Sequence, residues 1–378
     1  MWVDGAAWPG RAAGLLHSFV EAACQTEKLR QFLESNPAAA LREWQWEYDN
    51  VPQSLPPPRN AISVSIDDET LLGPVNWRTE PGKELLRQPQ LRLLLAGAKP
   101  LALIHGDEMS LTALASWARA RGYFGLLGPH EFLPRHDADK GGYSNRMIEV
   151  ASAQAGSGAW RGLLLAPDEQ TVLMAWLCQL FGWENFLGRL LGYPPCCCDA
   201  FESRWPIASR NYEGDVGLMY LAEVNSEAGQ PVYDLNWTVN IFARYFGWEI
   251  IQHFPCHWDC AATAALAQRY FSILSRYWPA EMRKTLQYLA APLLVTPNHG
   301  YSLFPGGQVV RENGSTSLIY DPELVQVIGM EGALANSVIS SSRLMSSPGG
   351  GWRIGDGEVP GWLLNINSDP FAVEETKR

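Results

Sequence analysis

The sequence predicts an α/β fold joined to an α-helical region: N-terminal helices and a βαβ-type parallel sheet, a helical middle part that carries a cysteine site, and a small antiparallel β-rich C-terminal lobe. Three observations lead to this prediction. Short apolar runs alternate with amphipathic segments in the first half, long apolar segments of helical periodicity fill the middle, and short runs separated by Gly, Asn and Pro fill the end. The 378 residues are enough for more than one domain.

We expect four consecutive parts along the chain. Residues 1–60 form a helical segment that ends in a Pro-rich linker, VPQSLPPPRN. An α/β domain follows over 61–167, and a helical region that holds the metal site covers 168–290. The β-rich lobe takes 291–378, where hairpin-like turns separate short strands.

The α/β domain is predicted from three apolar runs. LALIHG (101–106) and YFGLLG (123–128) flank an amphipathic segment at 107–122, and RGLLLAPDE (161–169) supplies the third run. Strand, helix and strand with short connections are typical of a βαβ unit, which predicts parallel strands. No glycine-rich phosphate-binding loop follows any of these runs, so no nucleotide site is expected.

The helical region contains two long apolar segments of helical periodicity, residues 235–254 and 261–278. They lie on either side of a cysteine motif. We therefore expect two long helices that flank the motif.

Charge and hydropathy restrict the class of protein. Apolar residues make up 47% and charged residues 18%, as in a globular protein with a sizeable core. The net charge of −11 argues against a nucleic-acid partner, because such proteins bind through basic patches. No apolar run is long enough to span a membrane and the N-terminus lacks the features of a signal peptide, so we expect a cytoplasmic protein without a membrane partner. In that reducing compartment, clustered cysteines favour a metal site or catalysis over disulfides.

Five of the seven cysteines are concentrated in two motifs, GYPPCCC at 192–198 and HFPCHWDC at 253–260. Each motif reads aromatic, Pro, Cys, and each precedes a segment of good helix formers. Because Pro is favoured at the first helical position, we expect both Pro-Cys steps at helix N-termini. The partial positive charge there stabilises a thiolate. The other two cysteines, Cys24 and Cys178, fit plain core residues.

The favoured ligand set for a metal consists of four of these thiols: Cys196, Cys197, Cys256 and Cys260. On a helix, residues 256 and 260 would share one face, and adjacent thiols can converge at a helix entry. Neither pair has the CxxC spacing of a zinc ribbon, and the surrounding segments are apolar. We therefore expect an iron–sulfur cluster of the 4Fe-4S type, with zinc as the alternative. Thiol chemistry without a metal and simple burial are the other interpretations of the motifs.

Four side chains beside these ligands are candidates for catalysis: His253, His257, Cys198 and Asp199. The histidines bracket Cys256 and suit proton transfer or metal ligation. Cys198 is a spare ligand or a nucleophile, and Asp199 is an acid/base group or a first-turn acid that suits the helix dipole. In the α/β domain, His105 and Asp107 end a strand, where open α/β sheets bind ligands, although Asp107 also suits a helix N-cap.

The paired motifs resemble a pattern in uncharacterised prokaryotic proteins, in which a GYPxCC element precedes an HxPCxxxC element. The resemblance covers residues 188 to 260 and carries over five residues: Cys196, Cys197, His253, Cys256 and Cys260. Cys198 stands where the pattern has an ordinary residue. The resemblance implies a metal site but no particular reaction.

Two functions are compatible with these expectations. The first is an iron–sulfur enzyme, of oxidoreductase or lyase type, that acts on a small-molecule substrate and has an electron-transfer protein as a further partner. Its cluster would be held by the two Pro-Cys helix N-termini. The alternative is a non-catalytic four-cysteine structural site, zinc or cluster, in a partner-binding or redox-sensing protein.

Overall fold

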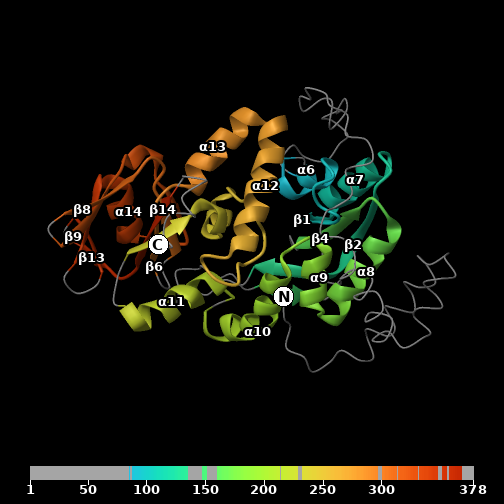
Figure 1. The fold of residues 1–378 in the computed structure, drawn as a ribbon, viewed down its shortest axis with the longest axis horizontal. Coiled ribbons are helices and arrows are strands. Elements are labelled where there is room, and N and C mark those ends of the chain that lie inside the picture. Colours follow the sequence, from blue (N-terminus) through green and yellow to red (C-terminus); the bar gives the residue numbers. More distant parts are fainter. Residues whose placement is uncertain are drawn as a thin grey trace. The chain divides into compact units, whose positions relative to one another are not determined.

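The computed structural model describes residues 85, 87–134, 147–150, 160–212, 214–228, 232–296, 300–312, 314–330, 332–347, 351–355 and 357–367. Figure 1 shows the helices and strands of this part of the chain, which combines α-helices with three sheets. The helices and linker expected over residues 1–60 lie outside it, and so does Cys24. The division into four parts stays a prediction.

The first sheet has the strand order β1-β4-β2-β3. Its strands are β1 (Ala102–Asp107), β2 (Phe124–Pro134), β3 (Met147–Val150) and β4 (Trp160–Ala166). All neighbours pair antiparallel, so the prediction of a parallel sheet is wrong. β1 and β2 do run in the same direction, because both pair antiparallel with β4. β4 lies between them, and the local strand–helix–strand spacing carries no information about a later strand that inserts there.

Two helices cover opposite faces of this sheet. Leu163 of β4 packs with Ile104 of β1 and with α7 (Glu108–Arg119) on one face. The preceding residue, Gly162, faces α8 (Glu169–Phe181) on the other. This alternation follows from the period of two along a strand. The sheet therefore presents a second, glycine-containing face toward α8.

The turn after β1 begins α7. The Asp107 side chain accepts the backbone N–H of Ser110 at 2.9 Å, which makes Asp107 the N-cap of α7. This was one of the two roles that the sequence allowed for Asp107, and it accounts for the residue without a ligand.

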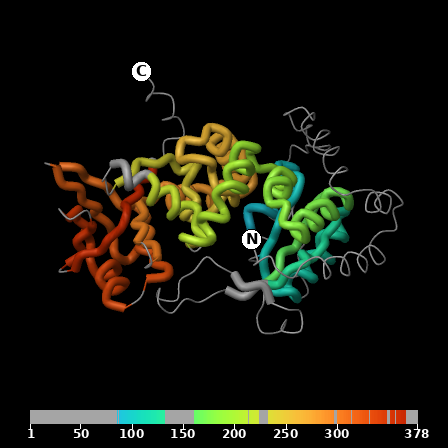
Figure 2. Tube along the Cα trace, turned by 90° about the horizontal axis from the view of Figure 1, so that it is seen from below, coloured from blue at the N-terminus to red at the C-terminus, as the bar shows by residue number. Residues whose placement is uncertain are grey.

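The middle of the described chain is mainly helical. Its α-helices are α9 (Glu184–Leu190), α10 (Pro195–Asn211), α11 (Val216–Ala228), α12 (Ala261–Tyr277) and α13 (Pro279–Leu289), whereas α6 (Pro89–Leu95) precedes β1 in the chain. In Figure 2 the tube of α10 to α13, yellow-green to orange, lies between the blue-green tube of β1 and β2 and the red tube of the C-terminal strands. The helix expected over 261–278 is confirmed by α12.

The other long helix, expected over residues 235–254, is absent from the described chain. This stretch instead forms β5 (Val232–Asn236), two 3-10 helices at Trp237–Val239 and Phe242–Phe246, and a loop. Aromatic side chains from it, including Trp237 and Phe242, fill a core with Tyr270 of α12. The apolar periodicity therefore reports burial, and tertiary packing decided the backbone conformation.

Two further sheets contain the C-terminal strands. The first has the order β10-β7-β6-β14-β5 and the second the order β13-β12-β11-β9-β8. The second is antiparallel, as expected, whereas β14 pairs parallel with β5 and makes the first sheet mixed. The strands are β6 (Leu293–Thr296), β7 (Gly300–Leu303), β8 (Gln308–Glu312), β9 (Ser315–Ile319), β10 (Gln326–Ile328), β11 (Arg343–Ser346), β12 (Trp352–Ile354), β13 (Gly357–Val359) and β14 (Trp362–Asn367), with α14 at Gly332–Ser340 and a 3-10 helix at Pro322–Leu324.

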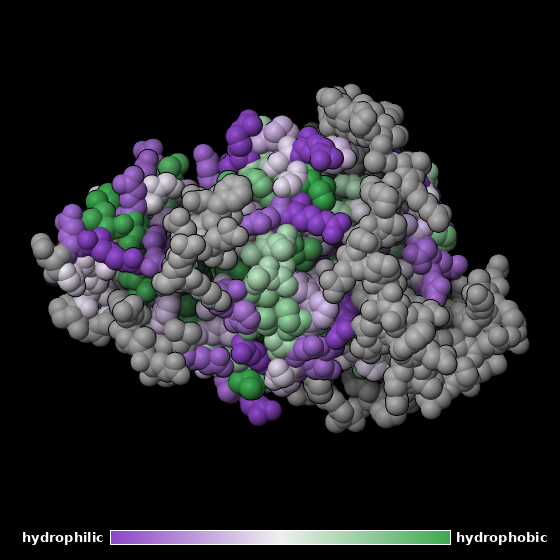
Figure 3. All heavy atoms as spheres, in the orientation of Figure 1, coloured by the Kyte–Doolittle hydropathy of each residue, from purple (hydrophilic) through white to green (hydrophobic). Residues whose placement is uncertain are grey.

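The described surface is mixed in polarity. On the face shown in Figure 3, hydrophilic and hydrophobic residues are interspersed. Large apolar side chains that are exposed come from separate elements, for example Met109 of α7, Ile207 of α10 and Ile319 of β9. Of the helices described, none has the length and apolar composition needed to cross a membrane.

Candidate metal centre

The first cysteine motif begins a helix, as the sequence predicts. Helix α10 has a Pro at its first position, and the preceding Pro194 is extended, with φ −59° and ψ 133°. The N–H groups of Cys197 and Cys198 donate to the Pro194 carbonyl at 2.9 and 3.1 Å. Cys196 and Cys197 therefore lie in the first turn, where the positive end of the helix dipole favours negative charge.

The second motif does not begin a helix at Pro255, so that prediction is wrong. Residues 251–260 are irregular, and α12 begins only after Cys260. Cys260 is the N-cap, because its Sγ accepts the N–H of Thr263 at 3.4 Å. The pairing of Cys256 with Cys260 therefore comes from a loop and not from one helical face. A Pro fixes φ equally well in a loop as in a first helical turn.

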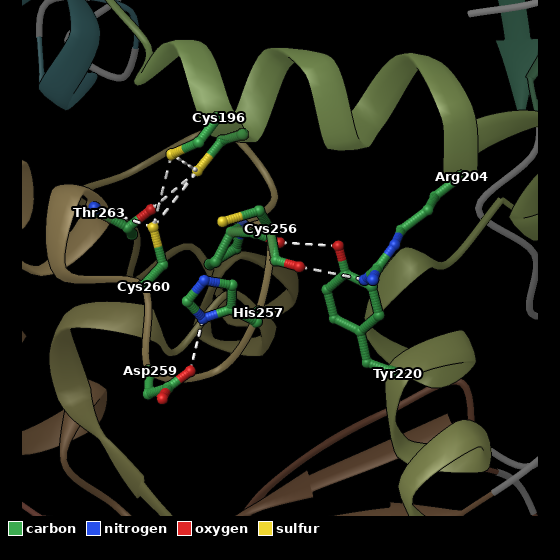
Figure 4. A network of polar contacts seen from close by, with 10 residues as sticks. Cys196, Arg204, Tyr220, Cys256, His257, Asp259, Cys260 and Thr263 are labelled. Carbon is green, nitrogen blue, oxygen red and sulfur yellow. Dashed lines mark hydrogen bonds and ion pairs between the residues drawn. The ribbon is translucent and has the colours of Figure 1, made fainter.

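The thiols of both motifs converge on one point, as Figure 4 shows for the labelled members Cys196, Cys256 and Cys260. The Sγ atoms of these three and of Cys197 all lie within 4.8 Å of one another. Cys197 is 3.9 Å from Cys196 and 3.6 Å from Cys260, and Cys196 is 4.0 Å from Cys260. Cys197 and Cys260 are buried and Cys196 is exposed, so the group lies at the edge of the core. Together the four thiols can hold a metal ion.

Side chains from two helices fix the loop that carries Cys256. The Tyr220 hydroxyl of α11 donates to the Pro255 carbonyl at 2.8 Å, and Arg204 Nη1 of α10 donates to the Cys256 carbonyl at 3.1 Å (Figure 4). The Arg204 guanidinium also lies over the Tyr220 ring, 4.6 Å from its centroid. The loop is therefore held by protein contacts on the side away from the sulfur atoms.

His253 supports the thiols through Thr263. Nε2 of the buried His253 ring lies 2.9 Å from the Thr263 hydroxyl, which lies 3.2 Å from Cys197 Sγ. Burial, with the nearby charges of Lys99 and Arg244, lowers the pKa of His253 to about 3, so the ring is neutral. With the proton on Nε2, the ring donates to the hydroxyl and the hydroxyl donates to the sulfur. With the hydrogen bonds in this direction, the one atom of the His253 ring that lacks a partner among the described residues is Nδ1, which is an acceptor.

The other two polar candidates point to the surface. The His257 ring turns toward Asp259, with Nδ1 2.5 Å from a carboxylate oxygen, and both side chains are exposed (Figure 4). Asp199 accepts from Asn185 at 2.8 Å and pairs with Arg189 at 3.0 Å. Neither His257 nor Asp199 belongs to the four-thiol group.

Cys198 points away from the other cysteines. Its Sγ lies 3.9 Å from the Tyr193 carbonyl, and a Cβ placed on Gly188 would be only 2.8 Å from it. Burial raises the pKa of the Cys198 thiol to about 12. A protonated thiol packed against a glycine is poorly suited to act as a nucleophile. Cys178 is also buried, on α8, in agreement with a core role.

The thiols of the group differ in acidity. Burial by itself would raise the pKa of Cys260, but hydrogen bonds from Thr263 and from Cys256 and Cys197 outweigh it and lower that pKa to about 6. Burial raises the pKa of Cys256 to about 12. Of the thiols whose pKa is shifted, Cys260 is therefore the one that ionises most readily, which suits a metal ligand.

Three residues of the centre were not identified from the sequence: Thr263, Arg204 and Tyr220. Thr263 has a detectable signal, because it follows Cys260 by three residues, the spacing of an N-cap and its N3 partner. Arg204 and Tyr220 act on backbone carbonyls of a loop whose path the sequence does not show.

No protein-family model, no curated protein and no solved structure matches this chain. The arrangement of the centre is therefore the basis for its interpretation. The resemblance to proteins with the paired motifs stays a prediction.

Proposed function

We propose that the four thiols bind a single metal ion, with zinc as the best fit, and that this ion is structural. The observation that carries the proposal is the spacing of the sulfurs: the three pairs among Cys196, Cys197 and Cys260 are 3.6, 3.9 and 4.0 Å apart, and all four sulfurs lie within 4.8 Å of one another. A regular tetrahedron with Zn–S bonds of about 2.3 Å has edges of about 3.8 Å. Three of the sulfurs therefore already stand near the separation that one tetrahedral ion requires, and Cys256 Sγ lies within 4.8 Å of each of them.

The same spacing argues against the 4Fe-4S cluster that the sequence favours. In such a cluster each thiolate binds a different iron atom at its own corner, so the four sulfurs stand farther apart than four donors on one ion. Here all four Sγ atoms are within 4.8 Å of one another. A cluster would require Cys256 and Cys260 to separate from Cys196 and Cys197, against the anchors at the Pro255 and Cys256 carbonyls.

A structural role follows from the ligand set. Four cysteine ligands fill the coordination sphere of zinc and leave no position for water or substrate. The ion would join the start of α10 to the loop before α12, segments more than fifty residues apart in the sequence. A metal link between these segments would stabilise the helical region because it lowers the conformational entropy of the unfolded chain, as any cross-link that closes a long loop does.

Metal analysis of the purified full-length protein tests the proposal. Prepared without oxygen, it is expected to be colourless and to hold about one zinc per chain, with neither iron nor sulfide. Replacement of zinc by cobalt should give the intense visible bands of tetrahedral thiolate coordination. A brown protein that contains iron and sulfide would overturn the single-ion proposal in favour of a cluster.

Matched variants assign the ligands. Cys197→Ser and Cys260→Ser should lose the metal, whereas Cys198→Ser should retain it, because its thiol lies outside the group. Retention of a full equivalent of zinc by Cys260→Ser would show that the ion lies elsewhere.

A further inference from the structure

Two pockets beside the metal centre share part of their lining. One has a volume of about 620 Å³ and the other about 390 Å³. His105, Arg244, Glu249 and Gln252 line both, so the pockets meet at these residues. We call the combined space the joined cleft and the shared residues its waist. Its size falls in the range of small-molecule sites.

Arg244 brings a fixed positive charge to the waist. Its Nε donates to the Ile241 carbonyl at 2.8 Å and its Nη2 to the His253 carbonyl at 3.3 Å. The guanidinium also lies over the Phe254 ring, 4.4 Å from its centroid. Within the described part of the chain no carboxylate pairs with it. A guanidinium that is oriented by carbonyls and lacks a counter-ion is ready to bind an anionic group.

Glu249 brings the opposite charge to the same waist. Its carboxylate accepts from Gln252 Nε2 at 3.0 Å, and the Gln252 carbonyl oxygen lies 3.5 Å from the Tyr193 hydroxyl. Glu249 and Arg244 line the same space, yet no ion pair of 4 Å or less joins them among the residues described. Two unlike charges held apart across a cleft suit a ligand that carries both charges itself.

The larger half of the joined cleft combines aromatic and apolar side chains with charged ones. Arg87, Arg92 and Glu281 also line it, and Arg92 pairs with Glu281 at 2.9 Å. Trp248 lines it and stacks on Tyr288, with ring centroids 4.1 Å apart at 17°. Leu274 and Met282 also line this half. At the waist, burial lowers the pKa of His105, so its imidazole is neutral and adds hydrogen-bonding capacity without charge. This gives the strand-end His105 a ligand-facing place.

We propose that the joined cleft binds a small zwitterion of the α-amino acid class with a bulky aromatic side chain. The carboxylate binds Arg244, the ammonium group binds Glu249, and the side chain occupies the larger half beside Trp248. The inference stands independently of which metal the four thiols hold.

Titration calorimetry on the metal-loaded full-length protein tests the ligand class with L-tryptophan, tryptamine and indole-3-propionate, and with L-phenylalanine and L-tyrosine. At least one of the three amino acids is expected to bind saturably. Tryptamine and indole-3-propionate should each bind about tenfold or more weaker than L-tryptophan, because each lacks one charge-assisted contact. Failure of all three amino acids to bind overturns the proposal, and so does equal binding by an analogue that lacks one charge.

Two variants locate the charges. Glu249→Gln keeps an acceptor for Gln252 but removes the charge, so amino-acid binding should weaken about tenfold or more while indole-3-propionate binding is unchanged. Arg244→Lys should weaken indole-3-propionate and leave tryptamine unchanged. Glu323→Gln, an exposed site on the 3-10 helix at Pro322–Leu324, is the matched control. Zinc content and melting temperature, measured on each variant, separate loss of the ligand site from loss of the fold. Unchanged amino-acid binding by folded Glu249→Gln would refute the assignment.

Discussion

Thr263 is the position where one oxygen atom serves both the metal centre and the core. Its hydroxyl lies 2.9 Å from His253 Nε2 and 3.2 Å from Cys197 Sγ, and the side chain is fully buried. Thr263→Val keeps the shape and the helix propensity nearly constant while removing that oxygen. The substitution therefore isolates the hydroxyl from the rest of the packing.

The expected loss has two components. The His253 Nε2–H would lose its partner, and because Nδ1 has none among the described residues, the whole buried ring would be unsatisfied. Such a loss costs about 1–3 kcal/mol of unfolding free energy. Removing a hydrogen bond to a ligand sulfur typically costs about 10–100-fold in metal affinity. Both effects should appear in the same variant.

Urea unfolding of the zinc-loaded protein measures the first component, and competition with a chromophoric chelator measures the second. Thr263→Ser is the matched control: it keeps the hydroxyl and removes one methyl group, for about 0.8 kcal/mol. The reasoning is refuted if Thr263→Val matches wild type in both measurements, or if the serine variant is as weak a zinc binder as the valine variant.

Three further predictions follow from the same contacts. Tyr220→Phe should speed removal of zinc by a chelator and cost about 1 kcal/mol of stability, because the Pro255 carbonyl loses its donor; an unchanged removal rate would contradict the anchoring role. Asp107→Ala should cost about 1 kcal/mol in urea unfolding through loss of the α7 cap, with zinc content unaffected; a lower zinc content would contradict a purely local role. Burial lowers the pKa of Lys99 to about 7, so unfolding takes up a proton between about pH 7 and 10.5, and stability rises with pH over that range; Lys99→Met should flatten this rise, which unfolding at pH 7 and pH 10 measures.

The Lys99 prediction depends on groups from several elements. The amine donates to Gln90 of α6 and lies over the rings of Tyr193 and Tyr270, with Glu249 as the nearby acid that raises its pKa against burial. None of these partners has its ordinary titration between pH 7 and 9. The part of the slope that disappears in Lys99→Met therefore belongs to the lysine, and the shifted cysteine thiols supply a background that is common to both proteins. A slope that persists in Lys99→Met would assign it to another group.

The close approach of Cys196, Cys197, Cys256 and Cys260 could be predicted from the sequence because these residues share a rare residue type and a repeated Pro-Cys context. Cys196 and Cys197 were also placed correctly at the start of a helix. The helix start in the second motif was predicted at the wrong residue. The sequence predicts a helix that begins at Pro255, whereas the helix begins five residues later, with the Cys260 thiol as its N-cap. Both residues can begin a helix, and only the path of the loop distinguishes them.

The fold was less accessible from the sequence for a related reason. Apolar runs at β1, β2 and β4 identified strands, but the order β1-β4-β2 depends on which strand inserts between two others. Periodicity at 235–254 likewise reported burial while the backbone formed a strand and 3-10 turns. Local sequence patterns indicate which side chains are buried, whereas the pairing of distant segments decides the direction of the strands and their order in the sheet.

The anchors of the second motif indicate how the metal relates to folding. Side chains of α10, α11 and the Phe242–Phe246 turn donate to the carbonyls of Cys256, Pro255 and His253. These bonds do not involve sulfur, and they hold the loop where its thiols face α10. The protein therefore bears part of the cost of ordering the loop before an ion binds, which makes the site preorganised. If the four thiols hold the proposed ion, we expect it to link α10 to a loop that is already anchored. Chelation should then lower the melting temperature while leaving most helix content intact. Loss of the helical circular-dichroism signal on chelation would show instead that the ion is needed for the fold itself.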